Sequence, residues 1–157
     1  MANNTEEGKV TVTYVGNVPT YTVKIKDFKK KMKTWPIGKL IRSELFTVNS
    51  VPLTPVPLTL EIYPNGDTAK EGHVSVFLKN NSVVNSTYGG NIQVDYTFKM
   101  KGKIVNHSKV DFQPSQVVGV SALYCHKGVA NIGGDDETKI GCTIRSLKKN
   151  VSDIQCH

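Results

Sequence analysis

The sequence predicts an all-β fold, an antiparallel sandwich or barrel built from about eight short strands. Apolar and polar residues alternate in one short run after another, which is the period of a strand with one buried face. Gly, Pro, Asn and Asp gather between these runs, as they do in turns. Because the runs follow one another without helical patterns between them, the strands are expected to pair antiparallel.

Alternating runs define the expected strands. They lie at residues 9–15, 21–28, 41–48, 58–63, 73–79, 92–100, 103–112 and 138–147. The alternation breaks between Leu45 and Phe46, as it does at a bulge or a strand end. Three prolines mark residues 48–58 as an extended loop or an edge connection, because proline cannot donate to a ladder. Residues 114–124 form the one stretch that could hold a helical turn.

Length and composition indicate a single domain. The chain has 157 residues, of which 38% are hydrophobic, and this is enough for one core. We expect a flexible N-terminus at residues 1–8, the domain at residues 9–147 and a flexible tail at residues 148–157. No stretch approaches the roughly 18 apolar residues of a membrane span, and the first residues lack the apolar core of a secretory signal.

The expected compartment is the cytoplasm, but glycosylation sequons argue for the extracellular alternative. The five Asn-x-Ser/Thr sequons begin at Asn3, Asn80, Asn85, Asn106 and Asn150. In a secreted protein each would mark a surface loop that carries a glycan. The extracellular alternative therefore stays open at this point.

The cysteines predict neither a disulfide framework nor a metal site. Three cysteines, at positions 125, 142 and 156, are too few and odd in number for paired bridges, so free thiols are expected. Cys142 is expected to be a small buried hydrophobic residue. The Cys-His pairs near positions 125 and 156 match no zinc spacing, so we predict no metal and no cofactor.

Phe77 interrupts an otherwise polar strand face. In residues 73–79, Val74, Val76 and Leu78 share one face, and Phe77 lies among His, Ser and Lys on the other. A phenyl ring at such a position would face water unless something covers it. Either a partner or a loop of the same chain can be the cover, and the pattern alone does not choose between them.

A basic run at residues 24–33 supplies part of the net charge of +7. Its lysines are Lys24, Lys26, Lys29, Lys30, Lys31 and Lys33. Such a run can bind phosphate groups, so binding to an anionic membrane or to nucleic acid through this cluster is the alternative function. A solvated strand end and loop explains the same lysines without a ligand, and no nucleic-acid-binding module accompanies them.

No catalytic motif stands out. The sequence contains no G-x-S-x-G, H-E-x-x-H, phosphate-binding loop or dinucleotide fingerprint. The four histidines form no pattern of nucleophile and base. Asp135 and Asp136 are adjacent, so on a strand they would point to opposite faces. The sequence therefore predicts a protein that is not an enzyme.

Five short motifs, in order, resemble the MATH domain, the meprin and TRAF homology domain. Residues 23–28 are similar to its W-x-I-x-x-F strand, with Val23 in place of tryptophan. "GKLIRSELF" at 38–46 is similar to G-x-x-I-x-S-x-x-F, and "LEIYPNG" at 60–66 resembles a strand that ends in a P-x-G turn. "HVSVFL" at 73–78 resembles Y-L-S-L-Y-L, and "DDETKIGC" at 135–142 resembles D-D-x-L-x-L-x-C.

The resemblance implies an eight-stranded antiparallel β-sandwich that binds an extended peptide of a partner in a shallow groove across one sheet. The groove positions that it implies are Phe77, Val94, Tyr96, Phe112, Val118, Gly119, Val120 and Ser121. Family members of this kind recruit substrates to ubiquitin ligases or bind receptor tails, so an adaptor role is expected. Here V-G-V replaces the W-G-F of substrate adaptors, so large anchors are missing from that segment.

Assembly is expected to be monomeric. The chain shows no heptad repeat of the kind that holds TRAF proteins together as trimers. Lysines on the outer strands would discourage edge pairing between copies. The chain shows no BTB or RING pattern, so alone it is expected to bind partners without transferring ubiquitin.

Overall fold

Strands dominate the computed structural model, which describes residues 5–50, 54–68, 72–82, 92–125 and 137–149. The elements are β1 (Thr5–Gly8), β2 (Val10–Val15), β3 (Val18–Lys26), α1 (Phe28–Thr34), β4 (Leu40–Ser43), β5 (Phe46–Ser50), β6 (Thr54–Tyr63), β7 (His73–Asn80), β8 (Ile92–Met100), β9 (Lys103–Phe112), β10 (Val117–Cys125) and β11 (Glu137–Lys149). The predicted all-β class is confirmed.

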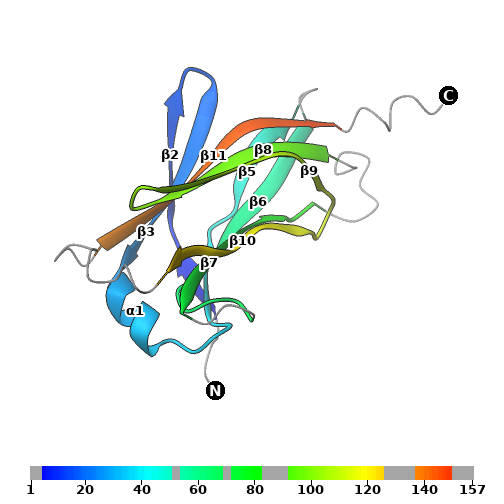
Figure 1. Cartoon of the computed structure of the whole chain (residues 1–157). Helices are drawn as coiled ribbons and strands as arrows, with labels where there is room; N and C mark the ends of the chain where they lie inside the picture. Colours follow the sequence, from blue (N-terminus) through cyan, green and yellow to red (C-terminus); the bar gives the residue numbers. More distant parts are fainter. Residues whose placement is uncertain (1–4, 51–53, 69–71, 83–91, 126–136, 150–157) are drawn as a thin grey trace.

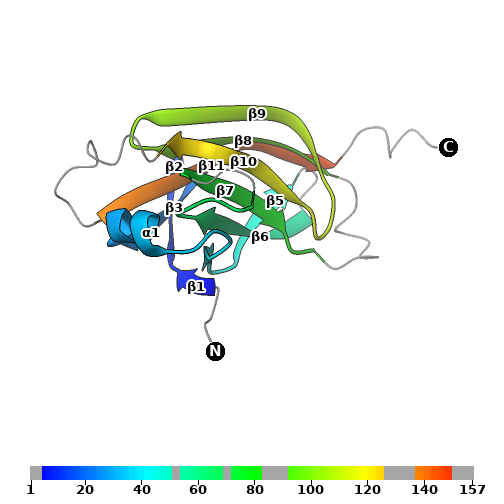
Figure 2. The ribbon, with the colours of Figure 1, turned by 60° about the horizontal axis from the view of Figure 1, so that its bottom comes forward.

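Two sheets pack face to face, so the fold is a sandwich rather than a barrel (Figure 1). The first sheet has the order β1-β4-β6-β7-β10, with β5 paired to β6 beside this path. The second sheet has the order β2-β3-β11-β8-β9. Among the described strands, β1 and β4 pair parallel and the other pairs are antiparallel. Figure 2 shows α1 at one end of the sandwich, beside β3.

The strands are more numerous than expected for three identifiable reasons. The expected strand at residues 41–48 ends at Ser43 and restarts at Phe46, so the predicted break is a strand end. We expected the N-terminal segment to be flexible, but residues 5–8 pair with β4 and therefore form β1. Residues 117–125 form β10, so the expectation of a helical turn at 114–124 was wrong.

The basic run at residues 24–33 is a strand end followed by a helix, not by a loop as expected. Phe28 and Met32 are both buried, and their spacing of four residues places them on one face of α1. The lysines between them lie on the remaining surface of the helix. Lys31 and Lys33 are in the last turn, where their positive charges interact favourably with the negative end of the helix dipole.

The prolines of residues 48–58 contribute to a strand at the margin of the first sheet. Pro55 and Pro57 belong to β6 and lie opposite Asn49 and Thr47 of β5. β7 pairs with β6 only from Leu58 onward, so the prolines lie beyond that part of the ladder. This placement fits the expected edge connection.

The core lies between the inner faces of the two sheets. Tyr21 of the second sheet stacks on Phe46 of the first, with ring centroids 4.1 Å apart. Val94, Tyr96 and Phe112 are each 0% exposed and belong to this core. The expectation that these three residues line a binding groove is therefore corrected, because a fully buried side chain offers no surface to a partner.

The exposed edges of the sheets differ from those expected. β2 and β10 are edge strands, and neither "VTVTYV" nor "VVGVSALYC" contains a charged residue. On β2, Val12, Tyr14 and Val15 are exposed, and in Figure 1 the β2–β3 hairpin rises beyond the other strands. Lysines therefore do not protect these two edges, which removes one of the two arguments for a monomer.

Candidate partner-binding site

Phe77 lies on the outer face of the first sheet, half-buried in the middle of β7. Its cross-strand neighbours are Glu61 of β6 and Gly119 of β10. The edge of Tyr63 meets the ring of Phe77, with centroids 5.8 Å apart and planes at 83°. Such edge-to-face pairs are a favoured aromatic geometry, so the two rings form one aromatic patch on this face.

Gly119 allows β10 to approach β7 closely beside Phe77. A Cβ atom at position 119 would lie 2.2 Å from the carbonyl oxygen of Val76 and 3.0 Å from Cδ1 of Phe77. Only glycine fits this contact, and the ring of Phe77 lies against the bare glycine backbone. An aromatic residue across from a strand glycine stabilises the pair, which accounts for part of the burial of Phe77.

A hydrogen-bond network fixes the turn after β6 against β7 and β10. The Ser75 hydroxyl lies 2.7 Å from the carbonyl oxygen of Ser121, to which it donates, and 3.2 Å from a carboxylate oxygen of Asp67. The backbone N–H of Asp67 donates to the same Ser75 oxygen at 3.1 Å. Because Ser75 is fully buried, this network holds Asp67 at the margin of the aromatic patch.

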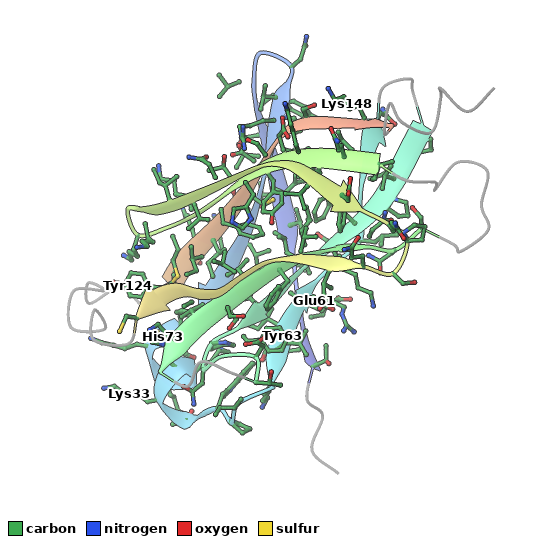
Figure 3. The ribbon with its side chains drawn as sticks, turned by 45° about the vertical axis from the view of Figure 1, so that its right-hand side comes forward. Lys33, Glu61, Tyr63, His73, Tyr124 and Lys148 are labelled. Carbon is green, nitrogen blue, oxygen red and sulfur yellow. The ribbon has the colours of Figure 1, made fainter. Side chains whose placement is uncertain are left out.

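A charged pair borders the aromatic patch on β4 and β6. The Arg42 guanidinium binds a Glu61 carboxylate oxygen at 2.8 Å, and the Glu61 side chain is only 7% exposed. Tyr63 lies two residues beyond Glu61 on the same face of β6 (Figure 3). Burial raises the pKa of Tyr63, with smaller contributions from Glu61 and Asp67. The Tyr63 hydroxyl therefore stays protonated at neutral pH and can donate a hydrogen bond.

We name the set Tyr63, Asp67, Phe77, Gly119 and Ser121 the Phe77 site. Three of its members, at positions 77, 119 and 121, were predicted from the sequence. Tyr63 and Asp67 were not, although the alternation of residues 58–63 already places Tyr63 on the outer face. The predicted neighbours Val118 and Val120 are half-buried and pack against the core, so they support β10 from within.

Comparison with known families decides the classification. A family model for the MATH domain matches residues 20–143, which is most of the chain. The chain belongs to the MATH-domain family. MATH domains are protein-interaction modules and are generally not enzymes, so this MATH domain serves protein binding. No curated protein matches the chain.

The basic lysines of this MATH domain do not form one continuous surface. Lys24 and Lys26 are exposed on β3, whereas Lys29, Lys30, Lys31 and Lys33 are distributed around α1. The Lys31 ammonium donates to the carbonyl oxygen of Lys26 at 2.6 Å. Lys31 and Lys39 also lie 5.6 Å and 4.2 Å from the centre of the Trp35 ring, at cation–π distance.

The remaining predictions concern cysteines, metals and sequons. Cys142 is fully buried, as predicted, and burial raises the pKa of its thiol. In the described part of the MATH domain, no three potential metal ligands gather. Asn80 is fully buried and its side chain donates to the carbonyl oxygen of Phe112 at 3.0 Å, so this sequon is closed in the folded state. Asn106 is on β9, and the other three sequons begin outside the described residues.

No helix among the described residues is long and apolar enough to cross a bilayer.

Proposed function

We propose that this MATH domain binds an extended segment of a protein partner across the outer face of β6, β7 and β10, at the Phe77 site. The observation that carries the proposal is the half-buried pair of Tyr63 and Phe77, two aromatic rings on a sheet face that is otherwise polar. Aromatic residues are enriched at the energetic centres of protein interfaces.

The edge of the first sheet supports this mode of binding. β10 is the last strand in the described order of the sheet and contains no charged residue. Such an edge strand can accept a partner strand through main-chain hydrogen bonds, while nearby side chains select its sequence. β10 also contacts β9 of the second sheet, so the partner would pair with the part of this edge that β9 leaves open. The Phe77 site lies directly beside this edge, so one extended segment can use both.

The polar members of the site give the expected partner its chemistry. The Tyr63 hydroxyl can donate a hydrogen bond, and Asp67 and Ser121 add acceptors beside it. Hydroxyl and amide side chains of the partner suit these groups. Because Val118 and Val120 are small and face the core, β10 adds no large anchor to the pair of Tyr63 and Phe77, and we expect modest affinity, on the order of micromolar.

The same proposal gives the cellular role. A module that binds one extended segment suits an adaptor that presents a substrate or a receptor in ubiquitin or TRAF-type signalling. We place this role in the cytoplasm. The absence of a heptad pattern in the sequence favours a monomer.

Peptides selected from a random display library on the immobilised chain provide the test. In isothermal titration, Phe77→Ala should weaken a selected peptide by about 2 kcal/mol, which is roughly 30-fold. Tyr14→Ala is the matched control, because Tyr14 is an exposed aromatic residue of β2 on the other sheet. Equal affinities for wild type, Phe77→Ala and Tyr63→Ala would refute the assignment of the site.

A further inference from the structure

The outer face of the second sheet carries a hollow that no part of the proposed peptide site uses. Its volume is about 660 Å³, within the range of roughly 300–1,000 Å³ that is usual for ligand sites. The hollow is lined by Thr20, Thr22, Lys99, Lys101, Gly102, Glu137, Lys139, Gly141 and Thr143. Gly141 lies in the middle of β11, and its missing side chain deepens the face at this point.

Strand register places the lysines of this hollow close to one another. Lys139 of β11, in the lining, lies directly opposite Lys24 of β3, which lies just outside the lining, and both are exposed. Gly141, two residues along β11, lies opposite Lys99 of β8. Lys101 follows Met100, the last residue of β8, which lies opposite Ile140 of β11. Three lysines of the lining and the adjacent Lys24 are therefore gathered on the surface that β3, β11 and β8 form.

These like charges make the surface receptive to an anion. Equal charges that lie directly opposite on neighbouring strands destabilise the pairing, as Lys24 and Lys139 do here. Among the described residues that line the hollow, Glu137 is the only acidic one. A ligand with several negative charges would remove the repulsion and gain attraction to each lysine.

Hydroxyl groups occupy the other end of the hollow. Thr143 lies opposite Thr20 on one side and Thr97 on the other. The hydroxyls of Thr20 and Thr143 are 2.7 Å apart and hydrogen-bonded. Hydroxyls both donate and accept, so this end can bind the main chain or polar side chains of a peptide.

We propose that this hollow, which we name the Gly141 hollow, binds an acidic segment of a protein partner, such as a run of Asp and Glu or a phosphoserine cluster. Its described lining has no aromatic side chain on which nucleic-acid bases could stack. It is recessed around Gly141, whereas a membrane presents a flat surface. It lies on the opposite face of the sandwich from the Phe77 site, so the two surfaces can bind separate segments.

A short fluorescein-labelled oligoglutamate peptide is the probe, and its binding to the intact chain is followed by fluorescence anisotropy. Lys99→Gln and Lys139→Gln should each weaken binding about two- to five-fold, as expected for exposed charge pairs, and together more than either alone. Lys33→Gln on α1 and Lys148→Gln near the far end of β11 remove the same charge outside the lining of the hollow, and should leave affinity unchanged.

Gly141→Val tests the shape of the hollow without changing its charge. A Cβ atom at position 141 would lie 3.6 Å from Thr20 and 3.8 Å from Thr22, so a side chain fits and fills the space. Valine suits a strand, so the variant should keep its circular dichroism spectrum. We expect it to weaken oligoglutamate at least as much as the loss of both lysines.

Three results would overturn the proposal. One is no binding of oligoglutamate by the wild type at low salt. Another is an equal loss of affinity in the lysine variants and in the Lys33 and Lys148 controls, which would show that the peptide binds the net positive charge of the protein rather than this hollow. The third is stronger competition by duplex DNA or phosphatidylserine vesicles than by unlabelled oligoglutamate, which would assign the surface to those ligands. Phe77→Ala should bind oligoglutamate normally, so this test is independent of the Phe77 site.

Discussion

Gly119 and Gly141 both lie in the middle of strands, yet alanine should have opposite effects at the two positions. At Gly141 the added Cβ atom would lie 3.6 Å from Thr20 and 3.8 Å from Thr22, which is ordinary van der Waals contact. Alanine also restricts the unfolded chain more than glycine does. Gly141→Ala should therefore stabilise the fold by roughly 0.5–1 kcal/mol.

At Gly119 the same change meets backbone atoms. The Cβ atom would lie 2.2 Å from the carbonyl oxygen of Val76 and 2.7 Å from Cα of Phe77. Backbone atoms cannot rotate away as a side chain can, so β10 would have to move off β7. Forcing extra atoms into such a contact costs about 1–3 kcal/mol, and Gly119→Ala should be destabilised by that amount.

Urea unfolding of both variants, followed by circular dichroism and by the fluorescence of the single tryptophan, Trp35, measures the two effects. In thermal unfolding, a change of 1 kcal/mol should move Tm by roughly 2–4 °C in a domain of this size. Stability changes of the same sign at both positions, or no loss in Gly119→Ala, would show that the close approach of β7 and β10 is not as described.

Three further predictions concern stability and assembly. Arg42→Ala should lower the free energy of unfolding in urea by about 1–3 kcal/mol, because the Glu61 side chain is only 7% exposed and its carboxylate would lose its partner. A decrease no larger than that of the surface variant Lys148→Ala would contradict this prediction. Burial raises the pKa of Tyr21 to about 12 from its ordinary 10, so the folded state holds its proton more tightly. The Tyr21 hydroxyl should leave the free energy of unfolding unchanged below about pH 10 and lower it between pH 10 and 12, by about 1 kcal/mol at pH 11. Urea unfolding curves that show no such fall would refute this prediction. Light scattering should give a mass near 17.3 kDa, whereas a dimer that Tyr14→Lys dissociates would identify pairing through β2.

Most of the fold could be predicted because alternation of apolar and polar residues directly reports strands with one buried face. α1 was missed because its signal is only Phe28 and Met32, four residues apart within a run of lysines. β10 was missed because its apolar residues do not alternate, and Gly119 and a register shift after Val120 interrupt it. β1 is short and polar, and its pairing with β4 is a long-range contact that a local sequence pattern cannot predict.

The binding surfaces could be predicted only in part. The alternation of residues 73–79 placed Phe77 on the outer face of its strand, and the structure confirms this. The alternation of residues 92–100 already places Val94 and Tyr96 on the apolar face, and only the family resemblance assigned them to the groove; both are buried. The Gly141 hollow combines residues of β3, β8 and β11, and its lysines become neighbours only through strand register.

Hydrogen–deuterium exchange with a library-selected peptide tests the proposed function most directly. If the peptide adds to the first sheet beside the Phe77 site, amides of β10 should become protected on binding, and those of β2 and β3 should not change. Phe77→Ala should reduce this protection at the same peptide concentration, while Tyr14→Ala should not. Protection confined to the second sheet, or unchanged protection of β10 in Phe77→Ala, would contradict the account.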